Sequence, residues 1–306
     1  GTAITTGDKN VAVGFQALQT ENDGDYNTAI GHQALKAQTG TSGTVQNTAV
    51  GFSAMGAITT GTYNTTLGGN TLLTATTALN NVAVGFNAMS DVKAGVAVDG
   101  CVAIGRAALK GNSSNTTGIN NTIAIGHNSL TALTEGQYNT AVGYLSGYQV
   151  STGDNNTFLG YGTAVYGPTT TSDNTFLGAH AGAGDNNNYT HDNNTAVGSY
   201  ALTLVSGCSS NTVLGSQAGR YVDTGDNNTF LGAGAGKGLN ADRMGSDNNT
   251  AVGYNAATAI TTASGSVFIG KDAGAVSATG NQNIGIGLTA LGGAATTGDN
   301  NIAIGV

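Results

Sequence analysis

A five-residue pattern of polar and apolar positions recurs along the whole chain, beginning with the residues Asn10 to Gly14. Each copy has one leading residue that is mostly polar, then three residues that alternate between two faces, and then a closing glycine. The commonest spacing between copies is 17 residues, with longer steps of 18, 20 or 21. A fixed period over the whole length predicts a repeat array in which each unit packs on its neighbours. The closing glycines are Gly14, Gly31, Gly51, Gly68, Gly85, Gly105, Gly126, Gly143, Gly160, Gly178, Gly198, Gly215, Gly232, Gly253, Gly270, Gly287 and Gly305.

The alternation within each copy predicts a short β-strand. The residue before the closing glycine, here called the anchor glycine, is Val, Ile or Leu in all 17 copies, and the residue two positions earlier is Thr, Val or Ile. A period of two with β-branched residues is typical of strands. Asn opens 14 of the 17 copies, and stacked Asn side chains can bond along an array. The sequence therefore predicts an all-β fold, a parallel β-roll or solenoid of about 17 coils with one anchor glycine each.

Two positions in each coil exchange volume. Where the residue two before the anchor glycine is Ala, Thr or Gly, the residue four after it is Leu or Met in nine of eleven coils. Two side chains that fill one space at native packing density behave in this way. We therefore expect the pair to meet inside the roll, with a second short strand starting near the small residue three after the anchor, such as Ala17 or Ala34. The opposite arrangement, bulky then small, occurs in Phe158 with Ala164, Phe176 with Gly182, Val213 with Gly219, Phe230 with Gly236 and Phe268 with Gly274.

An interior filled by that pair leaves the Val, Ile or Leu position pointing outward. At a spacing of about 4.8 Å per coil, the array would carry an apolar row roughly 80 Å long. A soluble monomer rarely exposes so large an apolar patch. The row therefore predicts a partner, and in a homo-oligomer the partner is the same row on another copy around a symmetry axis.

The composition agrees with a repeat array and disagrees with disorder. Gly contributes 50 of the 306 residues and only 8% of the chain is charged, yet 39% is hydrophobic at a strict period, whereas disordered chains are poor in hydrophobic residues. No shift in composition divides the chain, so residues 1–306 are expected to form a single elongated repeat array. Residues 2–6 are similar to the end of a coil, and Val306 follows an anchor glycine. Both ends are therefore expected to cut the array in mid-coil.

Charge and hydropathy narrow the range of partners. The net charge is −8 and there are only nine Lys and Arg residues, so no basic stripe is available for phosphates and no nucleic acid partner is expected. No apolar run approaches the roughly 18 to 20 residues of a membrane span. Membrane insertion is therefore not expected either.

The repeat signature resembles that of known fibrous proteins. The run Asn-Thr-Ala-Val-Gly, two variable residues, Ala-Leu and then Thr-Gly-Asp-Asn resembles the head repeats of trimeric autotransporter adhesins of the YadA type, and it is similar to repeat arrays in bacteriophage tail fibres. The resemblance covers essentially the whole chain. It implies a left-handed parallel β-roll, a homotrimer of three chains side by side, an extracellular, cell-surface or virion location, and attachment to a host cell-surface receptor such as a glycan. The period is longer than in the adhesin heads, which favours the phage-fibre variant.

The residues that could carry chemistry form no recognisable constellation. The four His residues, His32, His127, His180 and His191, lack the spacing of metal ligands, which favours surface or turn positions. Eight Asp residues lie six before an anchor glycine and could suggest calcium, but Val45, Thr62 and Leu79 interrupt the series, so turn formation is the favoured interpretation. The Asp residues are Asp8, Asp25, Asp99, Asp154, Asp192, Asp226, Asp247 and Asp299.

No catalytic motif is present in a supporting context, whether a nucleophile elbow or a pair of carboxylates. We therefore expect a protein that is not an enzyme, with no catalytic, cofactor-binding or metal-binding residues, and the sequence does not identify ligand-binding residues. Cys101 and Cys208 lie six coils apart, a separation of roughly 25 to 30 Å, whereas a disulfide needs Cα atoms within about 7 Å. Both thiols are expected to be free and buried, which favours assembly inside a cell and thus a virion part.

Several functions stay open at this point. The favoured one is a structural segment of a phage tail or virion fibre with a role in host attachment, and the first alternative is a cell-surface trimeric adhesin head. Thr stands three before the anchor glycine in ten coils, which is typical of ice-binding solenoids and makes a Thr-faced monomer the second alternative. That row is interrupted by Val11, Val82, Val102, Ile123, Val267, Ile284 and Ile302. A spacer shaft without a ligand of its own is also consistent with the sequence.

A binding role would place recognition on the loops or on exposed aromatic residues. The aromatic residues that directly follow an anchor glycine could stack on sugars or cover the edges of coils. They are Phe15, Phe52, Phe86, Tyr144, Tyr161 and Tyr254. The longest loops are residues 36–46, 91–100, 111–120, 183–193 and 237–247.

Overall fold

The fold was analysed in a computed structural model of the whole chain. It describes residues 3–39, 43–113, 116–166, 170–184, 191–204, 207–239, 244–277, 279–293, 295 and 297–306. Two compact units, Gly1–Asn155 and Asn156–Val306, make up the chain. Every regular element in the described residues is a β-strand. The predicted all-β parallel solenoid is thereby confirmed, with about 16 turns, while the single array across both units stays a prediction.

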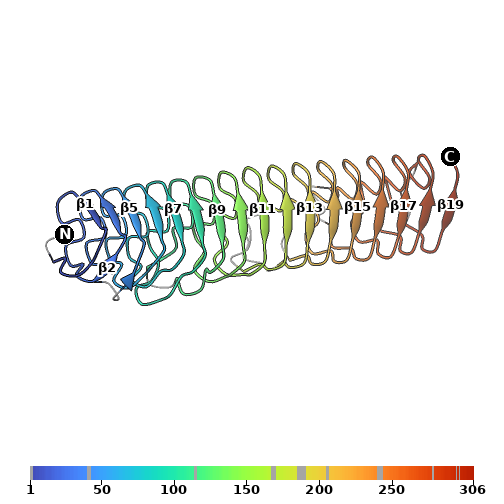
Figure 1. Cartoon of the computed structure of the whole chain (residues 1–306). Coiled ribbons are helices and arrows are strands. Elements are labelled where there is room, and N and C mark those ends of the chain that lie inside the picture. The colour runs from blue at the N-terminus through green and yellow to red at the C-terminus, as the bar shows by residue number, and fades with distance from the viewer. Residues whose placement is uncertain are drawn as a thin grey trace. The chain divides into compact units, whose positions relative to one another are not determined.

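The first unit contains a parallel sheet in which eight strands follow one another in chain order (Figure 1). Equivalent positions of successive coils are paired, as in Val11 with Thr28 and Val13 with Ile30. A separate pair of two-residue strands joins two neighbouring loops. The sheet strands are β1 (Val11–Val13), β3 (Thr28–Ile30), β5 (Thr48–Val50), β6 (Thr65–Leu67), β7 (Val82–Val84), β8 (Val102–Ile104), β9 (Ile123–Ile125) and β10 (Thr140–Val142), and the loop strands are β2 (Gly24–Asp25) and β4 (Gly43–Thr44).

The second unit repeats this arrangement with nine strands, also parallel and in chain order (Figure 1). Its register again joins equivalent positions, such as Thr212 with Thr229 and Leu214 with Leu231. The strands are β11 (Thr157–Leu159), β12 (Thr175–Leu177), β13 (Thr195–Val197), β14 (Thr212–Leu214), β15 (Thr229–Leu231), β16 (Thr250–Val252), β17 (Val267–Ile269), β18 (Ile284–Ile286) and β19 (Ile302–Ile304).

The strands are only three residues long because both of their ends are fixed by backbone conformation. The anchor glycine closes each strand with a φ that L-residues rarely adopt, 128° at Gly14 and 134° at Gly232. A Cβ at Gly14 would lie 2.5 Å from the carbonyl oxygen of Gly31 in the next coil. At the other end, the residue before the leading Asn has a left-handed backbone, with φ of 63° at Tyr26 and 58° at Asn227. The chain therefore turns sharply before and after each strand.

The interior of each coil is filled by the predicted pair of side chains. Val213 and Phe230 are fully buried, and a Cβ built on Gly219 or Gly236 would lie 3.3 Å or 2.5 Å from these side chains. In the first unit Leu18 is fully buried and occupies the position that the glycines hold in the second unit. The prediction that the two positions share one space is confirmed, because a Cβ on Gly236 would collide with the ring of Phe230.

The predicted second strand near Ala17 or Ala34 is wrong. The residues after each anchor glycine form turns, in which Ala17 N donates to the oxygen of Gly14 within the coil, at 3.3 Å. The next residue, Leu18, donates to the oxygen of Ala34 in the next coil at 3.1 Å, so coils stay joined without a strand. Left-handed φ angles of 57° at Gln16 and 47° at Leu18 bend the chain twice within three residues, which an extended strand does not allow.

Candidate interaction surfaces

The outward side chains of the strands form an uncharged, mostly apolar surface in each unit, which we call the strand face. Its apolar column consists of the residues before the anchor glycines, of which Val13 and Leu67 are 57% and 53% exposed in the first unit, and Leu214 and Leu231 are 45% and 43% exposed in the second. The outward direction predicted for this column is confirmed. The parallel column, three before the anchor, contains only Thr, Val and Ile, so no charged residue lies on the strand face.

Behind the strand face, the leading Asn residues form a buried hydrogen-bond ladder. The amide of Asn211 illustrates it: its Oδ1 accepts the backbone N–H of Asn228 at 2.9 Å, and its Nδ2 donates to the oxygen of Gly225 at 2.9 Å. The same rung recurs between Asn194 and Asn211 at 3.0 Å. The ladder satisfies buried polar groups that would otherwise destabilise the roll, and it therefore has a structural role.

Six of the eight Asp residues six before the anchors accept a backbone N–H of the preceding coil. The Asp25 carboxylate accepts the N–H of Asp8 at 2.7 Å, and the Asp226 carboxylate accepts the N–H of Ser209 at 2.6 Å. In the described part of the chain, no three His, Cys, Asp or Glu residues are grouped so that they could hold a metal ion. The cited bonds join neighbouring coils and give these Asp residues a structural role, which differs from the local turn expected from the sequence.

The four His residues lie in separate surroundings. The ring of His32 stacks between Phe15 and Phe52 with centroid distances of 5.2 and 5.1 Å, and His127 lies 3.0 Å from Arg106. In the second unit, the His180 ring stacks on Tyr200 at 5.0 Å. These contacts fit the expected surface and turn positions.

His191 differs from the others because it is buried. Its Nδ1 lies 3.2 Å from the Thr171 hydroxyl, and its ring lies edge-on to Phe176 with centroids 5.8 Å apart. Its Nε2 has no hydrogen-bond partner in the described residues. Burial lowers the pKa of His191 to about 4, so the ring is neutral at neutral pH. Nothing in the linear sequence predicts that this His is buried and the other three are not.

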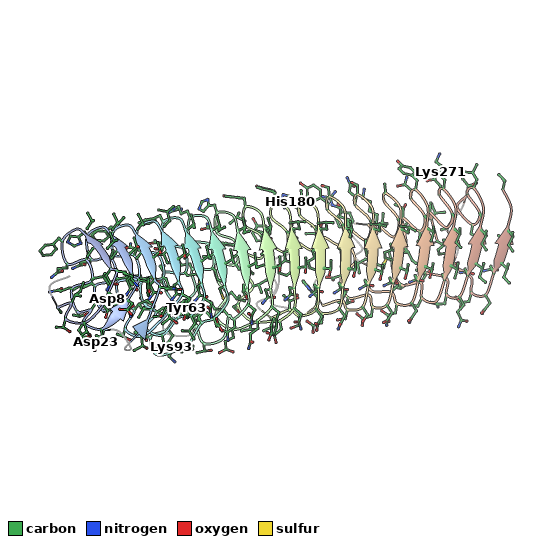
Figure 2. All side chains as sticks on the ribbon, in the orientation of Figure 1. Asp8, Asp23, Tyr63, Lys93, His180 and Lys271 are labelled. Carbon is green, nitrogen blue, oxygen red and sulfur yellow. The ribbon has the colours of Figure 1, made fainter. Side chains whose placement is uncertain are left out.

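The aromatic residues after the anchors lie on the turns that follow the strands. In the first unit they contact one another across coils, since His32 bridges Phe15 and Phe52, and His127 meets Tyr144 edge-on at 5.4 Å. In the second unit Tyr254 is 56% exposed and the residues at the same position in the two preceding coils are small. Figure 2 shows His180 and Lys271 of this unit on the same turn side. The rings of the first unit contact one another across coils, and Tyr254 follows two coils with small residues at its position.

Both cysteines are free and buried, as expected. Burial raises the pKa of each thiol to about 12, so neither forms a thiolate at neutral pH and neither is a nucleophile. Cys101 occupies a leading position of the Asn ladder, where its N–H donates to Asn81 Oδ1 at 2.9 Å. Its thiol donates to the oxygen of Ile119 at 2.8 Å. Cys101 is therefore a partial substitute for Asn.

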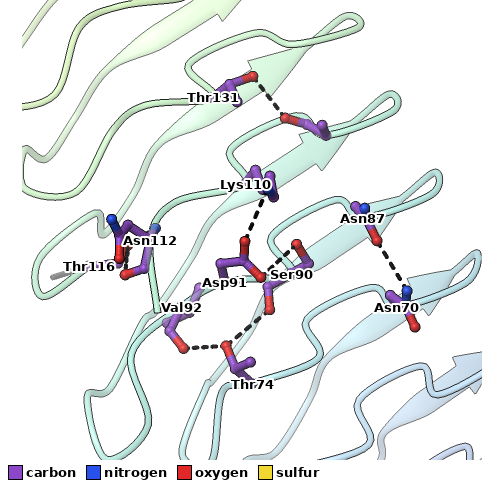
Figure 3. A network of polar contacts seen from close by, with 11 residues as sticks. Asn70, Thr74, Asn87, Ser90, Asp91, Val92, Lys110, Asn112, Thr116 and Thr131 are labelled. Atoms are coloured by element: carbon purple, nitrogen blue, oxygen red, sulfur yellow. Dashed lines mark hydrogen bonds and ion pairs between the residues drawn. The ribbon is translucent and has the colours of Figure 1, made fainter. Parts of the chain in front are cut away.

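Of the five longest loops, residues 91–100 are described completely. An ion pair of 3.3 Å between Asp91 and Lys110 connects this loop to the next coil, and the Thr74 hydroxyl donates to the oxygens of Ser90 and Val92 (Figure 3). The loop is thus bonded to its neighbours on both sides. Parts of the other four loops, residues 40–42, 114–115, 185–190 and 240–243, lie outside the described residues.

Sequence reasoning missed a hollow on the turn side of the second unit. Its volume is about 210 Å³, and it is lined by Ser216, Gln217, Ala233, Gly234, Lys237, Tyr254 and Asn255. It lies where Ala233 and Gly234 leave space between larger residues of the preceding and following coils. The sequence indicates this hollow only through the two small residues Ala233 and Gly234. Their significance is apparent only when the sequences of successive coils are aligned.

None of the described residues belongs to a helix that could cross a membrane. In comparisons with known proteins, no family model and no curated sequence matches this chain. The repeat architecture and its surfaces therefore provide the basis for a functional proposal.

Proposed function

We propose that this chain is a structural segment of a phage tail or virion fibre with a role in host attachment, and that it assembles as a homotrimer through the strand face. One observation carries the proposal: β11 to β19 present two outward columns without a charge, and the apolar column includes Leu159, Leu214 and Leu231, each more than 40% exposed. Eight steps of about 4.8 Å make this strip close to 40 Å long. Exposed apolar surface of such extent marks an interaction site.

A second copy of the same chain is the partner that this surface fits. Because equivalent positions are in register along each unit, a parallel copy places Leu and Val against Leu and Val at every coil, with no buried charge. A closed ring of identical chains buries the strip of every copy. The repeat signature resembles trimeric fibres, which supports three chains and left-handed winding. A fibre that attaches to a host fits the remaining surface, which is rich in turns.

The decisive experiment measures the solution mass of the chain by light scattering. The proposal expects three times the 30.1 kDa of one chain, and Leu214→Asp, which buries a charge in each of three copies, should dissociate the trimer. Leu239→Asp is the matched control, because Leu239 is 41% exposed but lies in a loop outside the strands. A monomer at micromolar concentration would contradict the proposed assembly.

A binding assay with bacterial cells distinguishes a phage fibre from a cell-surface trimeric adhesin head. A labelled trimer of a phage fibre should bind saturably to bacterial cells, and the Leu214→Asp variant should bind less because it loses multivalency. Binding to animal cells or extracellular matrix and not to bacteria would favour a cell-surface trimeric adhesin head instead.

A Thr-faced monomer is the second candidate, and one observation favours it. Six consecutive strands, β11 to β16, carry Thr in the column three before the anchor, at Thr157, Thr175, Thr195, Thr212, Thr229 and Thr250, with neighbours in direct register. Such a row could match a regular lattice such as ice. Thermal hysteresis of a monomeric chain, lost in Thr212→Lys, would support this candidate and overturn the fibre proposal.

A further inference from the structure

The hollow in the second unit lies where a row of exposed amide side chains is interrupted by a single residue without an amide, here called the missing rung. Amide side chains two residues after the anchor pair with each other across coils in the first unit. Gln33 donates to Gln16 at 2.7 Å, and Asn70 donates to Asn87 at 3.2 Å, as Figure 3 shows. Three consecutive members of the equivalent row in the second unit are Gln217, Gly234 and Asn255. The two amides therefore stand two coils apart, about 10 Å, and cannot bond to each other.

The glycine at the missing rung allows the side chain of the next coil to approach closely. Gly234 has a φ of 70°, and a Cβ there would collide with Oδ1 of Asn255. Asn255 thus extends over Gly234, while Gln217 faces the same space from the other coil. Neither amide side chain has a hydrogen-bond partner in the described residues, so their donors and acceptors are available to a ligand.

The remaining walls of the hollow add one positive charge and one aromatic ring. Lys237 lines it and has no acidic partner in the described part of the chain, although the chain as a whole has a net charge of −8. Tyr254 forms another wall and is 56% exposed. An aromatic ring packs against the C–H face of a sugar, amides bond to its hydroxyls, and an ammonium group pairs with a carboxylate.

We infer that this hollow binds an acidic sugar, a pyranose that carries a carboxylate, as part of a surface glycan. Lys237 pairs with the carboxylate, Gln217 and Asn255 bond to hydroxyl groups, and Tyr254 packs on the ring. The volume of about 210 Å³ suits one monosaccharide, so the remainder of the glycan extends into solvent. The inference rests on the proposed attachment function for its biological role, and a trimer would present three such sites and gain affinity through multivalency.

Saturation-transfer NMR on the full chain tests the site with defined probes. The probes are sialyllactose and a disaccharide ending in glucuronic acid, each compared with a neutral sugar of the same length. At least one acidic probe should bind, and Lys237→Gln should weaken it about tenfold and abolish the preference for acid over neutral sugar. Tyr254→Ser should remove binding of the acidic probes and of the neutral sugars. Absence of binding by both acidic probes would overturn the inference.

Two further variants separate loss of the site from loss of folding. Gly234→Asn restores the missing rung, and Asn adopts the required backbone at the equivalent Asn70 and Asn87, where φ is 56° and 59°. This variant should keep the melting temperature and lose the sugar. Tyr144→Ser, at the same coil position in the first unit, should leave binding unchanged. Binding that survives Gly234→Asn would contradict the assigned hollow.

The solution mass keeps this inference distinct from the proposed function. A trimer that binds neither acidic probe would overturn the sugar site and leave the fibre assembly intact. A monomer that binds sialyllactose through Lys237 and Tyr254 would overturn the assembly and leave the sugar site intact.

Discussion

The two units build the same coil from opposite distributions of volume. In the first unit most strands place Ala inside, as at Ala29 and Ala83, and the turn supplies Leu or Met, as at Leu35 and Met89. In the second unit β11, β12, β15 and β17 place Phe inside, and the turn opposite them supplies Gly or Ala. In these coils, therefore, either the strand or the turn can provide the larger side chain.

The outer turns differ between the units in a related way. Rings and amides on the turns of the first unit contact their neighbours, as Phe15 does with His32 and Gln16 with Gln33. The second unit has such a contact between His180 and Tyr200. In the second unit Ala233 and Gly234 leave the hollow beside Tyr254. Two chain segments with one architecture thus have different surfaces, and the difference comes from single residues at fixed positions of the coil.

The largest expected change in stability comes from removing a buried aromatic ring in the second unit. Phe230→Ala leaves a cavity and should lower the free energy of unfolding by about 3–5 kcal/mol. Adding Gly236→Leu restores the arrangement of the first unit, where Leu18 tolerates a φ of 47° close to the 55° of Gly236. The double variant should recover a large part of the loss in a denaturant titration followed by circular dichroism. Additive losses would refute the exchange of volume.

Between pH 6.5 and 4, a pH titration should destabilise the second unit through His191. The folded pKa of about 4 lies below the value of 6.5 for a free imidazole, so between these values the unfolded chain binds more protons than the folded one. The contribution of His191 to stability is therefore constant above pH 6.5 and decreases as the pH falls toward 4, by about 3 kcal/mol in total at 1.36 kcal/mol per pKa unit. Hydrogen exchange near β12 and β13 at different pH values measures this loss.

Two His variants identify the group responsible. His191→Asn should abolish the pH dependence of exchange between pH 6.5 and 4, whereas His180→Asn, which changes a His on the turn side, should retain it. Equal slopes in the two variants would show that another group titrates.

Breaking the buried Asn ladder should have a somewhat smaller effect. Asn211→Ala leaves the N–H of Asn228 and the oxygen of Gly225 without their partners, and unpaired buried groups destabilise by about 1–3 kcal/mol. Thr212→Ala is the control, because it shortens an exposed side chain on the same strand. Amide exchange in β14 and β15 should accelerate in the first variant only, and a similar rate in both would assign no stability to the ladder.

The smallest expected change in stability comes from a variant that places Asn at the position of Cys101 in the hydrogen-bond ladder of the first unit. Cys101→Asn adds an amide that can bond to the oxygen of Ile119, which the thiol now contacts, and should raise the free energy of unfolding by about 1 kcal/mol. Cys208→Ser removes a buried thiol outside the leading position and should bring no gain. A destabilised Cys101→Asn variant would show that the cavity at this coil fits only the smaller side chain.

Much of the fold follows from the sequence because every coil repeats the same local rules. The alternation of residues such as Thr28, Ala29 and Ile30 predicts the strand, its outward face and its buried position, and the structure confirms all three. The pairing of Phe230 with Gly236 was predicted from volumes alone. The surface hollow was not, since its residues Gln217, Lys237 and Asn255 are ordinary in a linear sequence and meet only when successive coils are stacked.

The sequence by itself determined the repeat, the strand positions, the volume that fills each coil and the uncharged outer face, because these depend on residue size and period. Only the tertiary structure decided the backbone of the turns, where Leu18 and Tyr26 adopt left-handed angles that local preference disfavours. It also decided that His191 is buried and that Gly234 opens a gap. These features depend on contacts with the coils before and after, and a single coil does not contain that information.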